Sequence, residues 1–399
     1  MPVHSDPVTA WAASGAMALT GWPDRPPLGP PEPLVPRLHD VADRLGGALE
    51  DPLALLGERA AHLELTRAGS TSCGGSAHLV PTGDGWIALN LARPEDLDLL
   101  PAWLGREIEG DPWDAVTAAA RDRTAADLLA AAEGLGLPLA QLPEPPPVSP
   151  STGDLPVRWS RLRPGPPPAD SVAGLRVLDL TSLWAGPLCG ALLADLGADV
   201  VKVEATGRPD GGRGGPPAFF DLLNARKRGI ALDLGSVGGR ATLRALVEQA
   251  DVVLEASRPR ALLGLGIDAA RVMTAARPRA WVAITGYGGA GSEQLRVAFG
   301  DDAAVGGGLV GRDPTPVFCA DAAADPIAGL VAAAAVVEAA GRGGAWHIEV
   351  SMAEAARMCS GPQLPVPEGT TAAAARSRAS RGTAPAIGQH TDEVLRSLA

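Results

Sequence analysis

Lysine is the scarcest charged residue in this 399-residue chain. Lys202 and Lys227 are its only lysines, and arginine supplies the other basic side chains. Acidic residues outnumber basic ones, which gives a formal net charge of −12 at pH 7. Such a charge argues against nucleic acid or an anionic membrane surface, and we expect neither as a partner.

Cysteine is also rare, and the four cysteines lie far apart, at Cys73, Cys189, Cys319 and Cys359. No short spacing among them suggests a zinc site or a disulfide framework, so we expect no metal site and a reducing compartment. The chain lacks an uninterrupted run of eighteen apolar residues, and its first residues lack the charged start and apolar core of a signal peptide. These absences predict a cytoplasmic protein without a membrane partner.

The two common phosphate-binding motifs, GxGxxG and GxxxxGK[ST], are missing as well. Residues 175–204 instead contain an apolar run, LRVLDL, a turn, AGP, a helical pattern that stops at Gly197, and a second apolar run, ADVVKVE. Strand, turn, helix and strand in this order predict a βαβ unit. Ligands of parallel sheets lie where strand ends meet helix N-termini, so the turn at residues 185–187 is a candidate binding site.

The exact residues of this region indicate a family more specifically than the spacing of its elements does. The phrases DLTSLWAGP, LLADLGADVVKVE, LNARKRGIALDL, DVVLEASRP and WVAITGYG occur in this order between Leu175 and about Met358. This series resembles the family III CoA transferases, a group that contains formyl-CoA and carnitine CoA-transferases and α-methylacyl-CoA racemases. Pattern and resemblance together predict an α/β fold with a doubly wound, Rossmann-like CoA-binding domain and a smaller helical and β-meander domain.

Proline divides the chain. Residues 143–172 are too rich in proline for a long helix or a central strand, and they predict a linker. Upstream, LVPTGDGWIALNL predicts a hairpin, and Thr124 is placed to cap a helix that begins with AADLLAAA. The predicted parts are a helical and hairpin part at 1–142, the linker at 143–172, an α/β part at 173–360, a mobile low-complexity loop at 361–387 and a tail helix at 388–399.

The order of the segments differs from the usual order of the family that the chain resembles. There, the PTxDGW-like turn and the GxP phrase follow the α/β part, whereas here PTGDGW and GLP precede it. The family-like tail, GQHTDEVL, still ends the chain. We interpret the chain as a rearranged fusion in which residues 1–142 pack against residues 173–360. The alternative is that residues 1–142 form an unrelated helical domain.

The resemblance implies a carboxylate nucleophile in a DxxxG phrase at the start of a helix. The match is Asp325, with Gly329 four residues later and an alanine-rich helix behind it. Because Pro326 follows, Asp325 is also placed to be a simple N-cap. Asp321 is the alternative nucleophile, since a shift of four residues would put it in the same position.

Coenzyme binding is likewise implied by the resemblance. Trp184, Ala185 and Gly186 would approach the CoA, since small residues let backbone N–H groups come close. Tyr287, the single tyrosine of the chain, matches a position near the acyl group, although a lone tyrosine is equally compatible with a core residue.

A run of basic residues provides candidate phosphate contacts. Asn224, Arg226 and Lys227 lie in LNARKRG, where adjacent cations suit the phosphates of the coenzyme, although a solvated charge cluster is the alternative. Arg258 matches the end of a family phrase, ENFRP, but alanine and serine replace its Asn and Phe, which weakens the expected CoA contact.

Asp301 and Asp302 bear on the choice of chemistry. Racemases of the family have GHD where this chain has GDD, and His347 is the only histidine of the second half before the tail. An aspartate is a poor base for an α-proton unless burial raises its pKa by several units. Racemase chemistry is therefore disfavoured.

The sequence predicts an acyl-CoA:carboxylate CoA-transferase that works through a covalent aspartyl intermediate. Its partners would be an acyl-CoA and a carboxylic acid acceptor, with coenzyme A as part of the substrate and no tightly bound cofactor. The family also implies a homodimer, whose crossing connections a long linker can span. The alternatives are a 2-methylacyl-CoA or arylpropionyl-CoA racemase and a non-catalytic acyl-CoA-binding or assembly protein.

Overall fold

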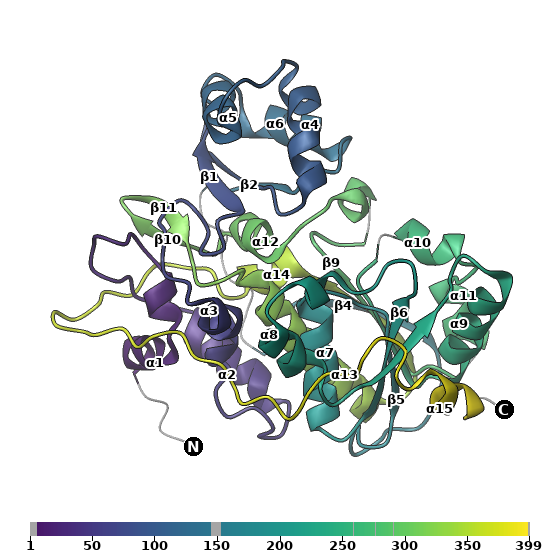
Figure 1. Cartoon of the computed structure of the whole chain (residues 1–399). Coiled ribbons are helices and arrows are strands. Elements are labelled where there is room, and N and C mark those ends of the chain that lie inside the picture. Colours follow the sequence, from purple (N-terminus) through teal and green to yellow (C-terminus); the bar gives the residue numbers. More distant parts are fainter. Residues whose placement is uncertain (1–5, 145–152, 258, 276, 290, 398–399) are drawn as a thin grey trace.

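The computed structural model describes residues 6–144, 153–257, 259–275, 277–289 and 291–397. Its largest element is a seven-stranded sheet in the order β4-β12-β9-β8-β5-β6-β7 (Figure 1). The strands are β4 Val157–Arg163, β5 Arg176–Asp179, β6 Asp199–Ala205, β7 Arg228–Leu232, β8 Val252–Glu255, β9 Ala280–Thr285 and β12 Ala345–Ser351.

Six of these strands are parallel, and only the edge strand β4 is antiparallel to its neighbour β12. Counted along the chain from β5, the parallel strands lie in the order 3-2-1-4-5-6. The chain therefore leaves β5 in one direction across the sheet and later returns to the other side of it. Such a reversal leaves a crevice at the carboxyl ends of the strands between β5 and β8.

Helices cover both faces of this sheet, because alternate strand residues point to opposite faces. Val177 and Val252 pack in one apolar cluster with α7 and α13, whereas Leu178 and Val253 pack in another with α9, α10 and α11. The helices of this part are α7 Ala185–Asp195, α8 Pro217–Asn224, α9 Val237–Gln249, α10 Pro259–Gly264, α11 Ala269–Ala275, α12 Gly300–Gly306, α13 Ala324–Arg342, α14 Met352–Arg357 and α15 Thr391–Arg396.

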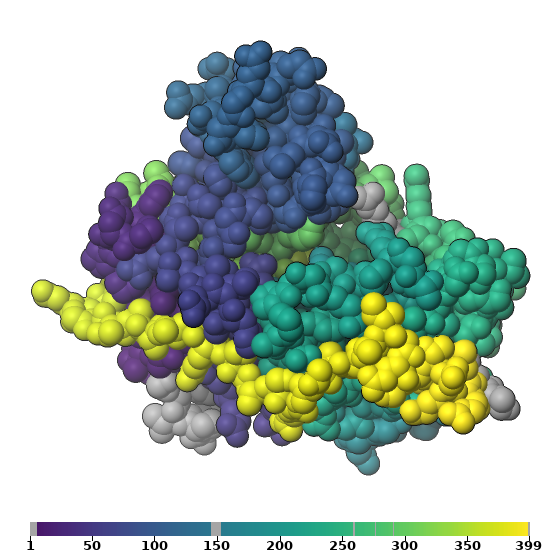
Figure 2. All heavy atoms as spheres, in the orientation of Figure 1, coloured from purple at the N-terminus to yellow at the C-terminus, as the bar shows by residue number. Residues whose placement is uncertain are grey.

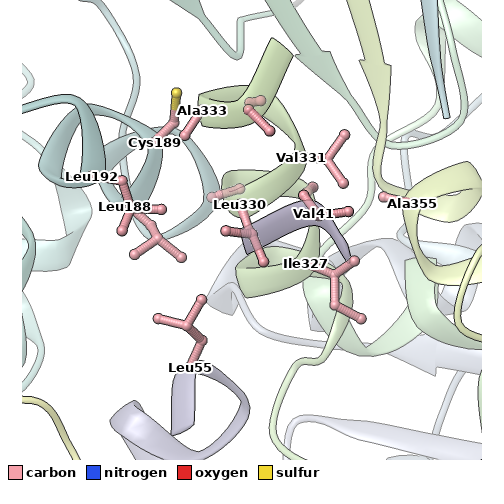
Figure 3. Close-up of a cluster of buried hydrophobic side chains, with 14 of the residues drawn as sticks. Val41, Leu55, Leu188, Cys189, Leu192, Ile327, Leu330, Val331, Ala333 and Ala355 are labelled. Atoms are coloured by element: carbon pink, nitrogen blue, oxygen red, sulfur yellow. The ribbon is translucent and has the colours of Figure 1, made fainter. Parts of the chain in front are cut away.

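The helix α13 lies at the centre of the molecule and packs along α7 (Figure 3). Gly329 permits this close approach, because a Cβ atom there would lie 2.6 Å from the carbonyl oxygen of Ala185. By length and composition α13 is apolar enough to cross a membrane, although its sequence had predicted no such segment. In the structure, 78% of its most apolar window is buried, as expected for the core helix of a globular domain.

The N-terminal part of the chain contributes a separate small sheet in the order β1-β2-β3, which is drawn at the top of Figure 1. The predicted hairpin is confirmed as β1 Ala77–Pro81 and β2 Trp86–Asn90, and the predicted cap is confirmed because Thr124 Oγ1 accepts a hydrogen bond from the N–H of Asp127. The remaining elements of this part are α1 Pro7–Ser14, α2 Leu34–Asp43, α3 Glu58–Leu63, α4 Pro94–Leu104, α5 Pro112–Ala120, α6 Ala125–Glu133 and β3 Leu139–Gln141.

The N-terminal part packs directly on the α/β part. Val41 of α2 and Leu55 lie against Ile327 and Leu330 of α13 in one continuous core (Figure 3). A small hairpin, β10 Val310–Asp313 and β11 Thr315–Phe318, lies beside β1. Four short 3₁₀ helices complete the described elements: η1 Ala16–Leu19, η2 Ala54–Gly57, η3 Gly211–Gly214 and η4 Gly291–Leu295.

Two sequence predictions about irregular segments need correction. The predicted linker contains a strand, β4, because residues 157–163 are free of proline and an edge strand pairs on one side only. The low-complexity loop at 361–387 is not free, because it is fixed by contacts on both parts of the chain. The N–H of Ala373 donates to Ala12 O, and that of Ala384 to the carboxylate of Asp221. This segment, called the C-terminal strap below, crosses one face of the molecule in yellow (Figure 2).

Candidate active site

The turn between β5 and α7 is tightly built at the carboxyl edge of the sheet. Leu183 has a left-handed backbone, with φ of +70°, and its side chain is 46% exposed. Its N–H donates to Asp210 Oδ1 over 2.9 Å. Gly186 must be small, because a Cβ atom there would lie 2.3 Å from the side chain of Thr181. Strained, exposed backbone of this kind concentrates at functional sites.

The predicted coenzyme contacts of this turn, Trp184, Ala185 and Gly186, are all buried. Trp184 lies edge-on to Phe219, with ring centroids 5.0 Å apart, and its indole N–H has no partner among the described residues. Ser182 and Leu183 are the exposed residues of the turn. A ligand would therefore meet the backbone and these two residues before it met Trp184.

Asp325 lies at the start of α13, opposite this turn. The residue is half-buried, and its carboxylate accepts hydrogen bonds from the backbone N–H groups of Ala185 and Gly300. The predicted N-cap role is wrong, because Ala323 occupies the N-cap position and α13 has no side-chain cap. The helix starts two residues earlier than expected, at Ala324, because Ala322, with φ of +44°, turns the chain just before it. The carboxylate thus faces α7 rather than the end of its own helix.

Asp321, the alternative nucleophile, is in a different environment. Its side chain is fully buried and pairs with Arg59, with Nε–Oδ2 and Nη2–Oδ1 distances of 3.0 and 2.5 Å. A two-point ion pair of this kind satisfies both carboxylate oxygens. Asp325 is therefore the more accessible of the two carboxylates.

Burial dominates the electrostatics around Asp325. Burial raises the pKa of Asp325 to about 7, while the charge of Arg59 opposes this rise and that of Asp301 adds to it. Burial likewise raises the pKa of Asp301 to about 6, again opposed by Arg59. Despite burial, the pKa of Arg59 is raised by Asp321 and, more weakly, by Asp301 and Asp325. Three carboxylates thus share one guanidinium.

Tyr287, which the resemblance placed near the acyl group, is hydrogen-bonded to the carboxylate of Asp302. Its hydroxyl donates to Asp302 Oδ2 over 3.1 Å, and the guanidinium of Arg296 lies 3.4 Å above its ring. Burial raises the pKa of Asp302 to about 7, although its hydrogen bonds from the Phe299 N–H and from Tyr287 oppose the shift. Burial thus raises the pKa of Asp302 as a racemase base would require. However, the carboxylate of Asp302 is already occupied by these hydrogen bonds.

Lys227 does not offer its charge to a ligand in this structure. The side chains of Lys227 and Asp179 are fully buried, with Nζ and Oδ2 2.8 Å apart. Nζ also donates to the carbonyl oxygen of Pro187 and to Asn224 Oδ1. Burial alone would raise the pKa of Asp179, but Lys227 and Lys202 lower it to about 2. Lys227 and Asn224 are therefore buried and engaged within the protein in this structure, and their role in phosphate binding stays a prediction.

The comparison with known proteins agrees with the wording of the sequence. Residues 172–391, more than half of the chain, match the model of CoA-transferase family III. The chain belongs to this family. Residues 1–142, which supply Arg59, lie outside the match.

Known relatives are similar to this chain over only part of their length. An acyl-CoA transferase of Fusarium pseudograminearum is 34% identical over 35% of this chain and 34% of its own length. A succinyl-CoA:mesaconate CoA-transferase of Haloarcula hispanica is 49% identical over 20% of this chain and 23% of its own length. The matches thus span about a third or less of these two relatives. A solved CAIB/BAIF family protein of Brucella suis is 32% identical, with a TM-score of 0.43, over 47% of this chain and 54% of that chain.

Two further family-based predictions have different outcomes. Arg226 is exposed but pairs with Asp195 over 3.3 Å, at the opposite end of α7 from Ala185. An eleven-residue helix is about 16 Å long, so the structure does not bring Arg226 to the turn. Arg258 lies outside the described residues.

Arg226 lines a cavity of about 710 Å³ between the N-terminal part and the C-terminal strap. Its wall also includes Asp195 of α7 and Arg378 and Arg381 of the strap, but not Asp325. The cavity is therefore separate from the nucleophile candidate. Among the described residues, no cluster of side chains suited to a metal is present.

Sequence reasoning missed the residues that the N-terminal part brings to this candidate site. Arg59 reaches Asp321, and a Cβ atom at Gly74 would lie 3.2 Å from Arg59 Nη2. The glycine pair at 74–75 was the only signal in the sequence, and it does not identify Arg59. The sequence around an arginine in a short helix does not indicate which distant residue its side chain will contact.

Proposed function

We propose that this chain is an acyl-CoA:carboxylate CoA-transferase whose nucleophile is Asp325. Membership of CoA-transferase family III supports the reaction class. The observation that carries the residue assignment is the position of Asp325, a half-buried residue whose carboxylate accepts from the N-terminal N–H of α7, whereas Asp321 is fully buried in an ion pair. Helix N-termini favour negative charge, which suits a carboxylate and the oxyanions formed from it.

The reaction would proceed through four acyl transfers at Asp325, two with the donor and two with the acceptor. The ionised carboxylate attacks the thioester carbonyl of acyl-CoA, forms a mixed anhydride and releases the CoA thiolate. The thiolate then attacks the aspartyl carbonyl, giving an aspartyl-CoA thioester and the first free acid. The acceptor carboxylate reverses these two steps, so that the new acyl-CoA leaves and Asp325 is regenerated as a carboxylate.

Coenzyme A would enter as part of the substrate, at the carboxyl edge of the sheet. We propose that the parallel strands form a doubly wound, Rossmann-like CoA-binding unit, since the strand order reverses beside the turn at Leu183. Only the class of acceptor, a carboxylic acid, is proposed, because the named relatives act on different acids, such as mesaconate and oxalate.

The test of Asp325 is chemical trapping of the intermediate. Wild-type protein is incubated with acyl-CoA and hydroxylamine, and peptide mass spectrometry locates the resulting hydroxamate. We expect it at Asp325 in wild type and nowhere in Asp325→Asn, whose transfer activity should fall at least a thousandfold while CoA affinity and the thermal midpoint change little.

Three outcomes would redirect the assignment. A hydroxamate at Asp321, with full activity in Asp325→Asn, would move the nucleophile four residues upstream. No hydroxamate but exchange of the substrate's α-proton in deuterated water would indicate a racemase. Neither signal, with acyl-CoA still bound, would indicate a non-catalytic binding protein.

A further inference from the structure

Arg59 connects the two parts of the chain beside the nucleophile candidate. It lies on the short helix α3, outside the residues that match the family. Its guanidinium holds the buried Asp321 at two points and lies over the ring of Trp184, 5.3 Å from the ring centroid. One side chain thus contacts both the loop before α13 and the turn before α7.

The loop before α13 is strained and is held mainly by the N-terminal part. Ala320 and Ala322 have φ of +58° and +44°, which non-glycine residues adopt rarely. The N–H of Ala320 donates to Thr20 Oγ1 over 2.9 Å, and the N–H of Asp321 donates to the carbonyl oxygen of Leu56 over 3.3 Å. A strained loop of this kind persists only where its surroundings determine it.

The α/β part also contributes a hydrogen bond to the same loop. The N–H of Ala322 donates to Asp301 Oδ1 over 3.1 Å. The thiol of Cys73, from the N-terminal part, lies 3.6 Å from the carbonyl oxygen of Ala320. The groups that face this loop are therefore Arg59, Asp301, Asp321, Asp325 and the Cys73 thiol.

We propose that Arg59 is a positioning residue for CoA transfer, which holds Asp321 and the strained loop so that Asp325 stays against the N-terminus of α7. This inference rests on the proposed function. Arg59 also provides the positive charge that opposes the raised pKa of Asp325, while the charge of Asp301 has the opposite effect. The N-terminal part therefore completes the candidate site of the α/β part.

The experiment compares Arg59→Gln and Arg59→Lys with a matched control, Arg44→Gln. Arg44 also belongs to the N-terminal part and pairs with α13, through Glu338 at 2.8 Å. Its side chain is 30% exposed, against 28% for Arg59. Glu338 lies thirteen residues beyond Asp325, roughly 20 Å along the helix, so the control removes a similar ion pair far from the nucleophile.

Two readouts are followed against pH. The first is the rate of CoA transfer. The second is the infrared absorption of the protonated Asp325 carboxyl, identified as the band lost in Asp325→Asn, which does not depend on activity. Arg59→Gln should raise the midpoint of both curves by about one pH unit, a tenfold change in proton affinity. In Arg59→Lys the midpoint should shift less than in Arg59→Gln, because the positive charge is kept. The transfer rate should still fall, because lysine cannot form the two-point pair with Asp321.

The outcomes separate this inference from the proposed function. Wild-type protein without transfer activity would remove the proposed function, while the infrared titration would still measure the effect of Arg59. If Arg59→Gln does not fold, the double variant Arg59→Gln/Asp321→Asn is compared with Asp321→Asn, and its midpoint should be the higher of the two, because these variants differ only in the charge at residue 59. Midpoints and rates equal to those of Arg44→Gln in a folded variant would overturn the role of Arg59.

Discussion

Burial sets the protonation of three aspartates at the site. Burial raises the pKa of Asp301 to about 6 and the pKa values of Asp302 and Asp325 to about 7. Transfer by Asp325 requires the ionised carboxylate, so the rate should fall as pH drops below about 7. The same groups affect stability in the opposite direction, because the folded state holds protons that the unfolded chain releases.

Stability should therefore decrease as pH rises from about 4 to about 7. In this window the folded chain binds more protons than the unfolded chain, which makes the slope of the unfolding free energy negative. For Asp302 alone the slope is on the order of 1 kcal/mol per pH unit. We expect Asp302→Asn, measured by urea unfolding at several pH values, to flatten the curve and to stabilise the protein at pH 8.

The control for this measurement is Asp98→Asn, which changes an exposed aspartate on α4. It should leave the slope unchanged. An Asp302→Asn curve as steep as that of wild type would show that Asp302 is ionised in the folded protein throughout this range.

Among the elements, the contact between α7 and α13 decides the geometry of the site. Ala185 begins α7, and Asp325 lies near the start of α13, so the spacing of the two helices determines how these residues face one another. Gly329 sets this spacing, because its missing side chain leaves room for the carbonyl oxygen of Ala185. The sequence had identified Gly329 only as part of a DxxxG phrase.

Gly329→Ala should separate the two helices. The new Cβ atom would lie 2.6 Å from Ala185 O, and a backbone atom cannot move aside cheaply, so we expect a loss of about 1–3 kcal/mol of stability. The transfer rate should fall as well. Urea unfolding and activity assays measure the two effects.

Gly341→Ala is the matched control on the same helix. A Cβ atom there would meet nothing within 4 Å, so alanine should stabilise α13 by up to about 1 kcal/mol through its higher helix propensity. If both variants gain stability, the close approach of α7 and α13 does not constrain residue 329.

The C-terminal strap contacts helix α3, which is far from it in the sequence. Arg378 of the strap pairs with Glu58, whose side chain is fully buried, and Ser377 lies within hydrogen-bond distance of His62. Both contacts fix α3, the helix that carries Arg59. A segment without regular structure thereby supports the element that reaches the nucleophile.

At the scale of the whole molecule, the two parts share one core and several ion pairs. Leu55 packs with α13, and Arg44 and Arg59 pair with Glu338 and Asp321 across the parts. We therefore expect the two parts to stay together without chain continuity through the linker. The division of the chain at the linker and the homodimer both stay predictions.

A protease site inserted in the linker should give two fragments that stay together. After cleavage, we expect both to elute as one species in gel filtration, with the activity of the uncut protein, and to separate only in denaturant. Insertion of the same length without cleavage controls for the longer linker. Fragments that separate freely, each of them stably folded, would contradict a shared core.

The sequence alone determined the local elements and the family. The βαβ unit, the hairpin at residues 77–90 and the cap by Thr124 are confirmed, because apolar periodicity and capping are encoded by neighbouring residues. The resemblance found the family for the same reason, since its phrases are contiguous. Asp325 was placed on the right helix but wrongly described as its cap.

Only the tertiary structure decided which charged residues serve the site. Lys227 was predicted to contact a phosphate, or else to be solvated, yet it is buried against Asp179, forty-eight residues away. Arg59 carried no signal, yet it reaches Asp321 across 262 residues. A charge gains its role from burial and from the groups that fold beside it, and these depend on distance in space rather than on distance along the chain.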